Sequence, residues 1–357
     1  MMRKRGADMM KRRNHLIAVA LVAGVSAVGA GEAPAERTWS DTADGFASVN
    51  ALGQDGTTGG AGGKTVTVTT RAGLEEYAAR KAPYIIRVRG AIAMKAKGRG
   101  ARVDVASDKT IIGVGTDAEL VGGGLYVGRG ARGIHYPRAH NVIIRNLSIH
   151  HSRNDGVTMD NAHHVWIDHC HFASHADGCI DSRKGTTCVT ISWCSFRHGG
   201  KTIGVGWDKN FTPGGDGRFK TQMTIHHNRF RDCQYRNPRV GQVHRAHLYN
   251  NYLRNISVRG NWASDGTQMV IENSCFENVN NPHDARSPGG PKDLPGAIVA
   301  RGNVYRNTRG SRDSGGKVEF EPGDFYKYTL DKAGDIPEIL SKYAGPQEDI
   351  GQASAEN

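Results

Sequence analysis

Short alternating apolar strands recur along the middle of the chain, and each ends in a small polar or thiol residue. Their last residues are 24, 24, 34, 23, 23 and 29 residues apart, a period that indicates a solenoid. Amphipathic helical stretches are missing between the strands, so the pattern predicts stacked β-coils, each with three short strands. The recurring segments are Val142–Asn146, Val165–Cys170, Val189–Cys194, Met223–Asn228, His247–Asn251, Val270–Ser274 and Ile298–Asn303.

The residues that end these segments should stack at one turn of every coil. Asn228 and Asn251 are expected to hydrogen-bond along the stack and so satisfy buried turn polarity. Cys170 and Cys194 occupy two consecutive steps, about 4.8 Å apart, which is within disulfide range. The pattern therefore predicts a Cys170–Cys194 disulfide, with two buried thiols filling a narrow core as the alternative that stays open. In most segments an apolar residue follows two positions later, as Phe172 and Phe196 do.

The N-terminus differs from the rest of the chain. Basic residues crowd the first 13 positions, the apolar run Leu16–Val28 follows, and small residues come next. This order is typical of a secretory signal peptide, which we place at residues 1–30. Residues 31–357 are then one β-coil domain with a polar C-terminal tail after about Lys332. We expect a secreted, extracellular protein without a membrane anchor.

The charge and the missing motifs narrow the possible partners. The formal net charge is +12, and the chain stays cationic without residues 1–30, which favours a polyanionic partner. Helix-turn-helix, zinc-finger and RNP patterns are absent, so we do not expect nucleic acid to be that partner. The six cysteines form no C-x-x-C pair, and no His-Glu-x-x-His occurs, which argues against zinc.

Three aspartates form the first candidate constellation. Asp177 and Asp181 lie four residues apart, an even spacing that puts both on one face of a strand, and Asp155 lies 22 residues earlier, close to one coil. Three carboxylates converging on one patch would be hard oxygen ligands, which suit Ca²⁺ rather than a transition metal. The alternative is that the three acids are separate and solvated.

Four cations form the second constellation. Arg183, Lys201, Arg236 and Arg239 lie at comparable places relative to their own repeats. A row of cations beside a row of carboxylates is unusual unless a metal and an anionic ligand complete it. Ion pairing between coils is the alternative, and it contributes little at a surface.

At this point the sequence resembles the pectate lyase type of polysaccharide lyase, over roughly residues 40–345. The likeness implies an all-β, single-stranded, right-handed parallel β-helix that cleaves pectate, the acidic plant cell-wall polysaccharide, by calcium-dependent β-elimination. It also implies a monomer. The segments that carry the likeness are Gly45–Ala47, Gly59–Gly63, Thr110–Gly115, Val165–His169, Asp177–Asp181, Val189–Trp193, Arg236–Arg239 and His247–Asn251.

The resemblance also implies residue roles. Asp155, Asp177 and Asp181 would bind calcium, and Arg236 would be the catalytic base. Lys201 and Arg183 would hold substrate carboxylates, with Arg239 secondary. Two positions depart from the family pattern: Arg153 stands where a further acid is frequent, and Gly241 stands where a second arginine is frequent. Arg245 is the candidate to take the place of that arginine.

Three other functions stay open at this stage. A metal-independent pectin lyase would act on methyl-esterified chains, but the retention of all three acids favours pectate. A polygalacturonase on a similar β-helix would use paired carboxylates to activate water. A non-catalytic β-helix that only binds acidic polysaccharide would need no base. Ultraviolet absorbance of an unsaturated uronide product separates the lyases from the other two.

Overall fold

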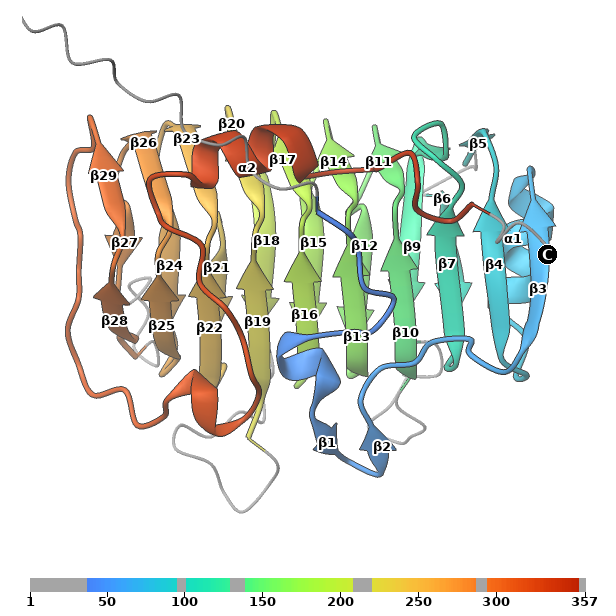
Figure 1. Cartoon of the computed structure of the whole chain (residues 1–357), viewed down its shortest axis with the longest axis horizontal. Coiled ribbons are helices and arrows are strands. Elements are labelled where there is room, and N and C mark those ends of the chain that lie inside the picture. The colour runs from blue at the N-terminus through green and yellow to red at the C-terminus, as the bar shows by residue number, and fades with distance from the viewer. Residues whose placement is uncertain (1–36, 95–100, 129–138, 208–219, 287–293, 353–357) are drawn as a thin grey trace, which may run out of the picture. The chain divides into compact units, whose positions relative to one another are not determined.

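Successive strands of the chain pass from one parallel sheet to the next, so that three sheets of stacked coils form (Figure 1). The computed structural model describes residues 37–94, 101–128, 139–207, 220–286 and 294–352. Residues 1–39 form one unit, of which only 37–39 are described, and Ser40–Asn357 form a second, compact unit that holds the sheets. The predicted signal peptide therefore lies outside the described residues. No helix in the described ranges is long and apolar enough to cross a membrane.

The three sheets have ten, nine and eight strands. The ten-stranded sheet contains β3 (Lys64–Val68), β4 (Tyr84–Val88), β7 (Lys109–Gly113), β10 (His140–Arg145), β13 (His163–Asp168), β16 (Thr187–Ser192), β19 (Gln222–His226), β22 (Arg245–Tyr249), β25 (Gln268–Glu272) and β28 (Ala297–Arg301). The nine-stranded sheet contains β5 (Ala91–Ala93), β8 (Glu119–Val121), β11 (Ser148–His150), β14 (His171–Ala173), β17 (Ser195–Arg197), β20 (Arg229–Arg231), β23 (Tyr252–Ile256), β26 (Cys275–Val279) and β29 (Val304–Arg306). The eight-stranded sheet contains β6 (Ala101–Val105), β9 (Gly123–Val127), β12 (Val157–Asp160), β15 (Gly178–Arg183), β18 (Lys201–Gly206), β21 (Arg239–Gly241), β24 (Asn261–Ser264) and β27 (His283–Asp284).

This arrangement confirms the predicted parallel β-helix. Each coil from β4–β5–β6 to β25–β26–β27 contributes one strand to each sheet, and the pairs between neighbouring coils are parallel and in register, as in β13 with β16. Inward side chains stack on their counterparts in the next coil: Ile167 pairs with Ile191, and the rings of Phe172 and Phe196 stack 5.3 Å apart between centroids. A repeating coil thus buries a continuous apolar core that no single coil could bury alone.

The turn from the ten-stranded to the nine-stranded sheet carries the predicted ladder. The Oδ1 atom of Asn251 accepts a hydrogen bond from the backbone N–H of Asn228 at 3.0 Å, and Asn228 accepts one from the N–H of Cys194 at 2.9 Å. One step of our alignment was wrong. Arg145 pairs with Asp168, so Leu147 rather than Asn146 aligns with Cys170. Asn146 instead adopts a left-handed conformation with φ of 59°.

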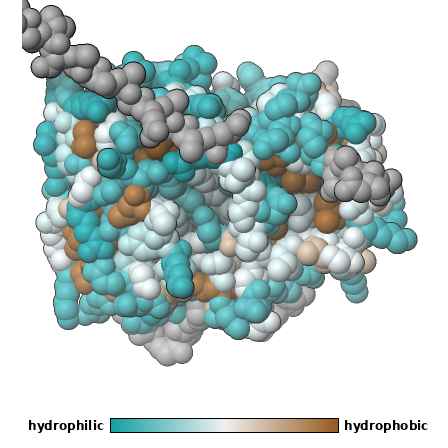
Figure 2. Space-filling model, in the orientation of Figure 1, coloured by the Kyte–Doolittle hydropathy of each residue, from teal (hydrophilic) through white to brown (hydrophobic). Residues whose placement is uncertain are grey.

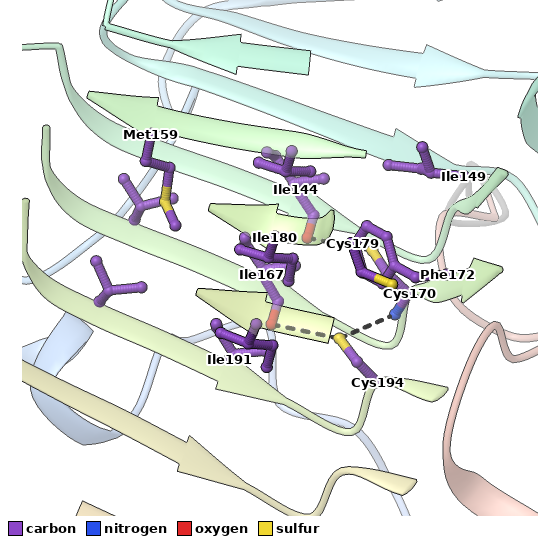
Figure 3. Close-up of a cluster of buried hydrophobic side chains, with 14 of the residues drawn as sticks. Ile144, Ile149, Met159, Ile167, Cys170, Phe172, Cys179, Ile180, Ile191 and Cys194 are labelled. Carbon is purple, nitrogen blue, oxygen red and sulfur yellow. Dashed lines mark hydrogen bonds between the residues drawn. The ribbon is translucent and has the colours of Figure 1, made fainter. Parts of the chain in front are cut away.

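The six cysteines all lie in the described ranges, and each is a free, buried thiol. Cys170 and Cys194 are stacked as predicted, but the backbone N–H of Cys170 donates to Cys194 Sγ at 3.4 Å and the predicted disulfide is not formed (Figure 3). The Cys194 thiol donates to the backbone carbonyl of Ile167 at 3.8 Å. The structure thus matches the alternative that was left open, in which the thiols fill the narrow core.

Segments from both ends of the compact unit cover the outer face of the ten-stranded sheet. Near the N-terminus, the 3₁₀ helix Gly45–Ser48 rests on that sheet: the backbone N–H of Phe46 donates to Thr224 Oγ1 at 2.9 Å. The hairpin β1 (Asn50–Ala51) and β2 (Gln54–Asp55) follows it. Two helices, α1 (Arg71–Ala78) and α2 (Ile336–Tyr343), and a second 3₁₀ helix, Pro322–Asp324, complete the described elements.

The C-terminal segment also closes onto the coils. The backbone N–H of Gly345 donates to the carbonyl of Trp193 at 2.7 Å, and that of Gln347 donates to Asn146 Oδ1 at 2.7 Å. The face of the molecule in Figure 2 is mainly hydrophilic, with separate hydrophobic spots. The outer face of the eight-stranded sheet lacks these coverings among the described contacts, and the candidate site lies there.

The ladder makes a direct prediction about stability. We expect Asn228→Ala to lower the free energy of unfolding by about 3 kcal/mol, because it leaves a buried N–H and a buried carbonyl without a partner. Asn228 is fully buried, whereas Asn307, which donates to Asn278 in an exposed row, is the control, and its replacement by alanine should cost less than about 1 kcal/mol. Chemical denaturation of both variants measures the difference, and equal losses would contradict the buried role of Asn228.

Candidate active site

The predicted site residues come together where the nine-stranded sheet turns into the eight-stranded sheet. Asp155 and Asp177 directly precede β12 and β15, Lys201 begins β18, and Arg236 precedes β21. Between these strands lies an open cleft of about 420 Å³. Its lining residues are Asp177, Asp181, Arg183, Lys184, Lys201, Trp207 and Arg236.

Two of the three aspartates form a carboxylate pair, with Asp155 buried and Asp181 partly buried in the lining of the cleft. Asp155 is only 6% exposed and accepts hydrogen bonds from Thr158 Oγ1 and the backbone N–H of Gly178, both at 3.0 Å. A Cβ atom on Gly178 would lie 3.1 Å from Asp155 Oδ1 and 3.6 Å from Asp181 Oδ1, so both oxygens face this glycine. Burial, and after it the Asp155 carboxylate, raises the pKa of Asp181 to about 6.

The third aspartate lies apart from this pair, at the rim. The Asp177 side chain is 46% exposed and its Oδ1 accepts a hydrogen bond from Lys201 Nζ at 2.6 Å. Within the described ranges, no three acidic, histidine or cysteine side chains are grouped closely enough to hold a metal. The structure therefore brings Asp155 and Asp181 together as predicted, while Asp177 is engaged by a cation.

The chemistry of the pair fits a hard divalent cation. Its donors are carboxylate oxygens. Burial, and after it the neighbouring Asp155 carboxylate, raises the pKa of Asp181, and a bound cation would favour the ionised form against both effects. Calcium takes six to eight oxygen ligands, so further donors would come from water and from an anionic ligand.

Arg183 is held by an acid that the sequence analysis did not consider. Its Nε and Nη2 atoms donate to the two carboxylate oxygens of Asp160 at 2.7 and 3.3 Å, and Lys184 Nζ donates to the same carboxylate at 2.8 Å. Arg183 Nη1 still lies 3.8 Å from Asp181 Oδ2. The guanidinium is therefore fixed at the edge of the cleft, with one side directed at the acidic pair.

Arg236 approaches Gly204 on β18, as the Asp181 carboxylate also does. It has a left-handed backbone, with φ of 60°. Burial lowers its pKa below the usual arginine value, Asp181 opposes that shift, and Arg239 adds to it. The Arg239 guanidinium donates to Asp265 Oδ2 at 3.1 Å and is absent from the cleft lining. Of the two arginines in this motif, only Arg236 reaches the cleft.

A glycine forms the floor between the acid and the guanidinium. Gly204 on β18 pairs with Asp181 on one side and with Arg239 on the other. A Cβ atom at this position would lie 2.7 Å from Asp181 Oδ1 and 3.0 Å from Arg236 Nη1. It would also lie 3.1 Å from Trp207 Cη2. Three functional side chains thus converge over a residue that has none.

Trp207 is the aromatic wall of the cleft. It is 42% exposed, and its ring lies 5.0 Å from the Arg236 guanidinium and 5.3 Å from that of Arg239. Arg239 in turn lies 4.6 Å from the Trp262 ring. Guanidinium and indole groups therefore alternate, and cation–π attraction holds Arg236 in place. The sequence analysis missed both Trp207 and Gly204. The available signal was that Gly204 lies in, and Trp207 directly after, the strand that begins with Lys201.

The two departures from the family pattern have distinct outcomes. Arg153 is exposed and does not line the cleft. Arg245 begins β22 in the ten-stranded sheet, where it donates to Gln222 Oε1 at 3.1 Å and lies 4.4 Å from the Phe325 ring. It does not replace an arginine at Gly241, because the two residues belong to different sheets.

Known proteins show the same architecture and sequence pattern. The pectate lyase family model matches residues 16–289. A pectate trisaccharide-lyase of Thermotoga maritima is 31% identical over 372 residues, covering 94% of this chain and 96% of the relative. One from Bacillus licheniformis is 31% identical over 321 residues, covering 84% of this chain and 85% of the relative.

Solved structures agree with these relatives. A pectate lyase from Bacillus sp. N165, in complex with trigalacturonate, superposes with a TM-score of 0.69 at 27% identity and covers 85% of this chain and 98% of its own. The residue motifs, the three parallel sheets, the family model and the relatives lead to one conclusion. The chain belongs to the pectate lyase family.

Proposed function

We propose that this protein is a secreted, calcium-dependent lyase that cleaves 1,4-linked α-galacturonan by β-elimination and leaves a 4,5-unsaturated uronide. The observation that carries the proposal is the Asp155–Asp181 pair, whose Asp181 faces Arg236 across Gly204 in a cleft lined by cations. An acidic pair, a base and an open, charged cleft are what elimination next to a carboxylate requires. The trigalacturonate bound to the Bacillus sp. N165 enzyme supports a uronide as the substrate.

Calcium is part of the proposal because the residues present suit it. Asp155 and Asp181 would hold the ion, with Asp177 at the rim beside them. When bound, it neutralises the substrate carboxylate as a Lewis acid and so makes the neighbouring C5 proton more acidic. Asp177 is paired with Lys201, so calcium and substrate would compete for these two side chains.

The side chains of the cleft then divide the remaining work. Arg236 accepts the C5 proton, the bond from C4 to its glycosidic oxygen breaks as the double bond forms, and the departing oxygen takes a proton from water. Lys201 and Arg183 bind uronate and stabilise the charge that develops on it. Arg239, which lies against Trp207 and Trp262, acts only through the position of Arg236.

An arginine base predicts an alkaline pH optimum. A guanidinium is ordinarily protonated at all accessible pH values, and burial lowers the pKa of Arg236. Because the neutral form becomes more abundant as pH approaches this lowered pKa, kcat/KM should rise from neutral into alkaline pH. Initial rates across a pH series in calcium-containing buffer measure this, and a maximum in mildly acidic buffer would rule out Arg236 as the base.

Product analysis tests the reaction itself. Purified protein incubated with polygalacturonate and calcium should release oligomers that absorb in the ultraviolet and are lighter by one water than hydrolysis products. Fully esterified pectin should be cut far more slowly, because it lacks the carboxylates that the cations bind. Saturated products would instead identify a polygalacturonase, and uncleaved polymer a binding protein. Because the two named relatives are trisaccharide-lyases, an unsaturated trisaccharide is the product to look for first.

Export and assembly complete the proposal. The basic, apolar and small segments at residues 1–30 support secretion, which would bring the enzyme to extracellular pectate. We also propose that it acts as a monomer, because each chain carries the whole set of cleft residues.

A further inference from the structure

The outer face of the nine-stranded sheet carries a column of arginines. Arg197, Arg231 and Arg254 lie directly opposite one another on β17, β20 and β23. Arg229 lies two residues before Arg231 on β20, so both point to the same side of the sheet. We call the four residues Arg197, Arg229, Arg231 and Arg254 the arginine face. The residue between Arg229 and Arg231 is Phe230, which points into the core.

The positive charge of this face is only partly balanced. Asp232 lies 3.3 Å from Arg231, and Glu277 lies 3.4 Å from Arg254. In the described ranges, Arg197 and Arg229 make no ion pair, and the buried Nε atom of Arg229 makes no hydrogen bond. The pKa of Arg229 is lowered first by burial and then by Arg231. Like charges that face each other on adjacent strands are destabilising, so an anion bound here would relieve an existing repulsion.

Side-chain hydrogen bonds join neighbouring coils next to the arginine face. A second, exposed ladder runs along the ends of these strands: Asn255 donates to Asp232 at 2.8 Å, Asn278 to Asn255 at 3.1 Å, and Asn307 to Asn278 at 2.6 Å. These hydrogen bonds fix the strand ends next to the arginine side chains. The backbone positions of Arg197, Arg231 and Arg254 are therefore regularly spaced along the column, which suits a ligand with a regular repeat.

We propose that the arginine face is a second binding surface for the polyuronate chain, separate from the cleft. Parallel strands are about 4.8 Å apart, so the column presents cations at a repeat close to the advance of one linked sugar ring. A 1,4-linked uronide carries one carboxylate on every ring, and guanidinium groups bind carboxylates by paired hydrogen bonds. A linear acidic polysaccharide that runs across the strands is the ligand that this array fits.

The arginine face and the cleft belong to the same coils. Only residues 198–200 separate Arg197 from Lys201, and only residues 232–235 separate Arg231 from Arg236. A polymer held on the arginine face therefore stays close to the cleft between cuts, whereas a trisaccharide is too short to use both surfaces. The inference rests on the proposed function for the identity of the polyanion, and it adds a site that acts on long substrates.

Binding without turnover tests the inference. Migration of the protein in gels that contain polygalacturonate and chelator measures affinity while cleavage is prevented. We expect the variant R197Q/R231Q/R254Q to bind the polymer at least fivefold more weakly than the wild type, with an affinity that depends less on salt concentration. Its kcat/KM on trigalacturonate with calcium should stay within twofold of the wild-type value. The single variant Arg197→Gln, at an exposed position without an ion pair, should show a smaller loss in the same direction.

A matched control removes the same charge elsewhere. Lys64, Arg80 and Arg89 are exposed near the first coils, and K64Q/R80Q/R89Q should bind the polymer like the wild type. The inference would be overturned if the arginine-face variant bound the polymer as the wild type does, or if the control variant lost as much affinity. It would also be overturned if double-stranded DNA bound the protein as strongly as polygalacturonate does and with the same dependence on these arginines. Polymer that is bound through the arginine face but never cleaved would refute the proposed lyase function while leaving this surface in place.

Discussion

Replacing Arg236 by alanine is expected to lower kcat on polygalacturonate by about 10³-fold or more, because general-base catalysis typically contributes 10²–10⁴-fold. The side chain faces Asp181 across the cleft floor, and the other arginine of its motif, Arg239, is engaged by Asp265. The absorbance of unsaturated product at saturating substrate measures the loss.

Two further measurements separate loss of the base from loss of the site. Calcium affinity of Arg236→Ala, determined by titration calorimetry, should be equal to or higher than that of the wild type, because a cation beside the acidic pair has been removed. Arg236→Lys should be nearly as inactive, since a lysine ammonium does not reach the same geometry as the guanidinium. Activity above about a tenth of the wild type in Arg236→Ala would place the base elsewhere.

Adding one methyl group at Gly204 is expected to lower kcat/KM by about 100-fold, because displacements near 1 Å in a catalytic site cost that much. A Cβ atom in Gly204→Ala would lie 2.7 Å from Asp181 Oδ1 and 3.0 Å from Arg236 Nη1, so both groups must move. Gly200→Ala is the matched control, since a Cβ atom there meets nothing within 4 Å. Steady-state kinetics of the two variants provide the comparison.

The thermal unfolding of the two glycine variants keeps this comparison interpretable. Overpacking costs typically about 1–3 kcal/mol, which a β-helix of this size tolerates, so Gly204→Ala should remain folded at the assay temperature. A kcat/KM of Gly204→Ala within threefold of that of Gly200→Ala would show that the cleft floor does not set the distance between Asp181 and Arg236.

The repeat pattern predicted the fold because a β-helix is nearly one-dimensional. Each coil buries its apolar residues against the same residues of its neighbours, so strands at a regular period carry most of the topology. The predicted ladder position of Asn146 was wrong for a local reason. Its side chain accepts a hydrogen bond from Gln347 in the C-terminal segment, and Leu147 takes the ladder position. A polar residue at a strand end does not reveal which of two adjacent turn positions it fills.

The sequence predicted which residues make up the candidate site, but not which cation pairs with which acid. The acids and cations lie at equivalent places of successive coils, which made their convergence predictable. Which cation engages which acid depends on side-chain reach: Lys201 binds Asp177, and Arg183 is held by Asp160. Gly204 and Trp207 were not predicted, because a search for charged residues does not find them. Gly204 acts by lacking a side chain, and Trp207 carries no ionisable group.

The proposed mechanism requires the Asp155–Asp181 pair and the Arg236 guanidinium to act on one uronate ring, with calcium between protein and substrate. The most direct measurement follows the absorbance of polygalacturonate incubated with purified protein while calcium is added and then removed by chelator. We predict an absorbance that rises only while calcium is present, stops on chelation and resumes when calcium is restored in excess, and that stays flat throughout for Asp181→Asn. An absorbance that climbs undiminished in chelator, or in Asp181→Asn, would contradict the account.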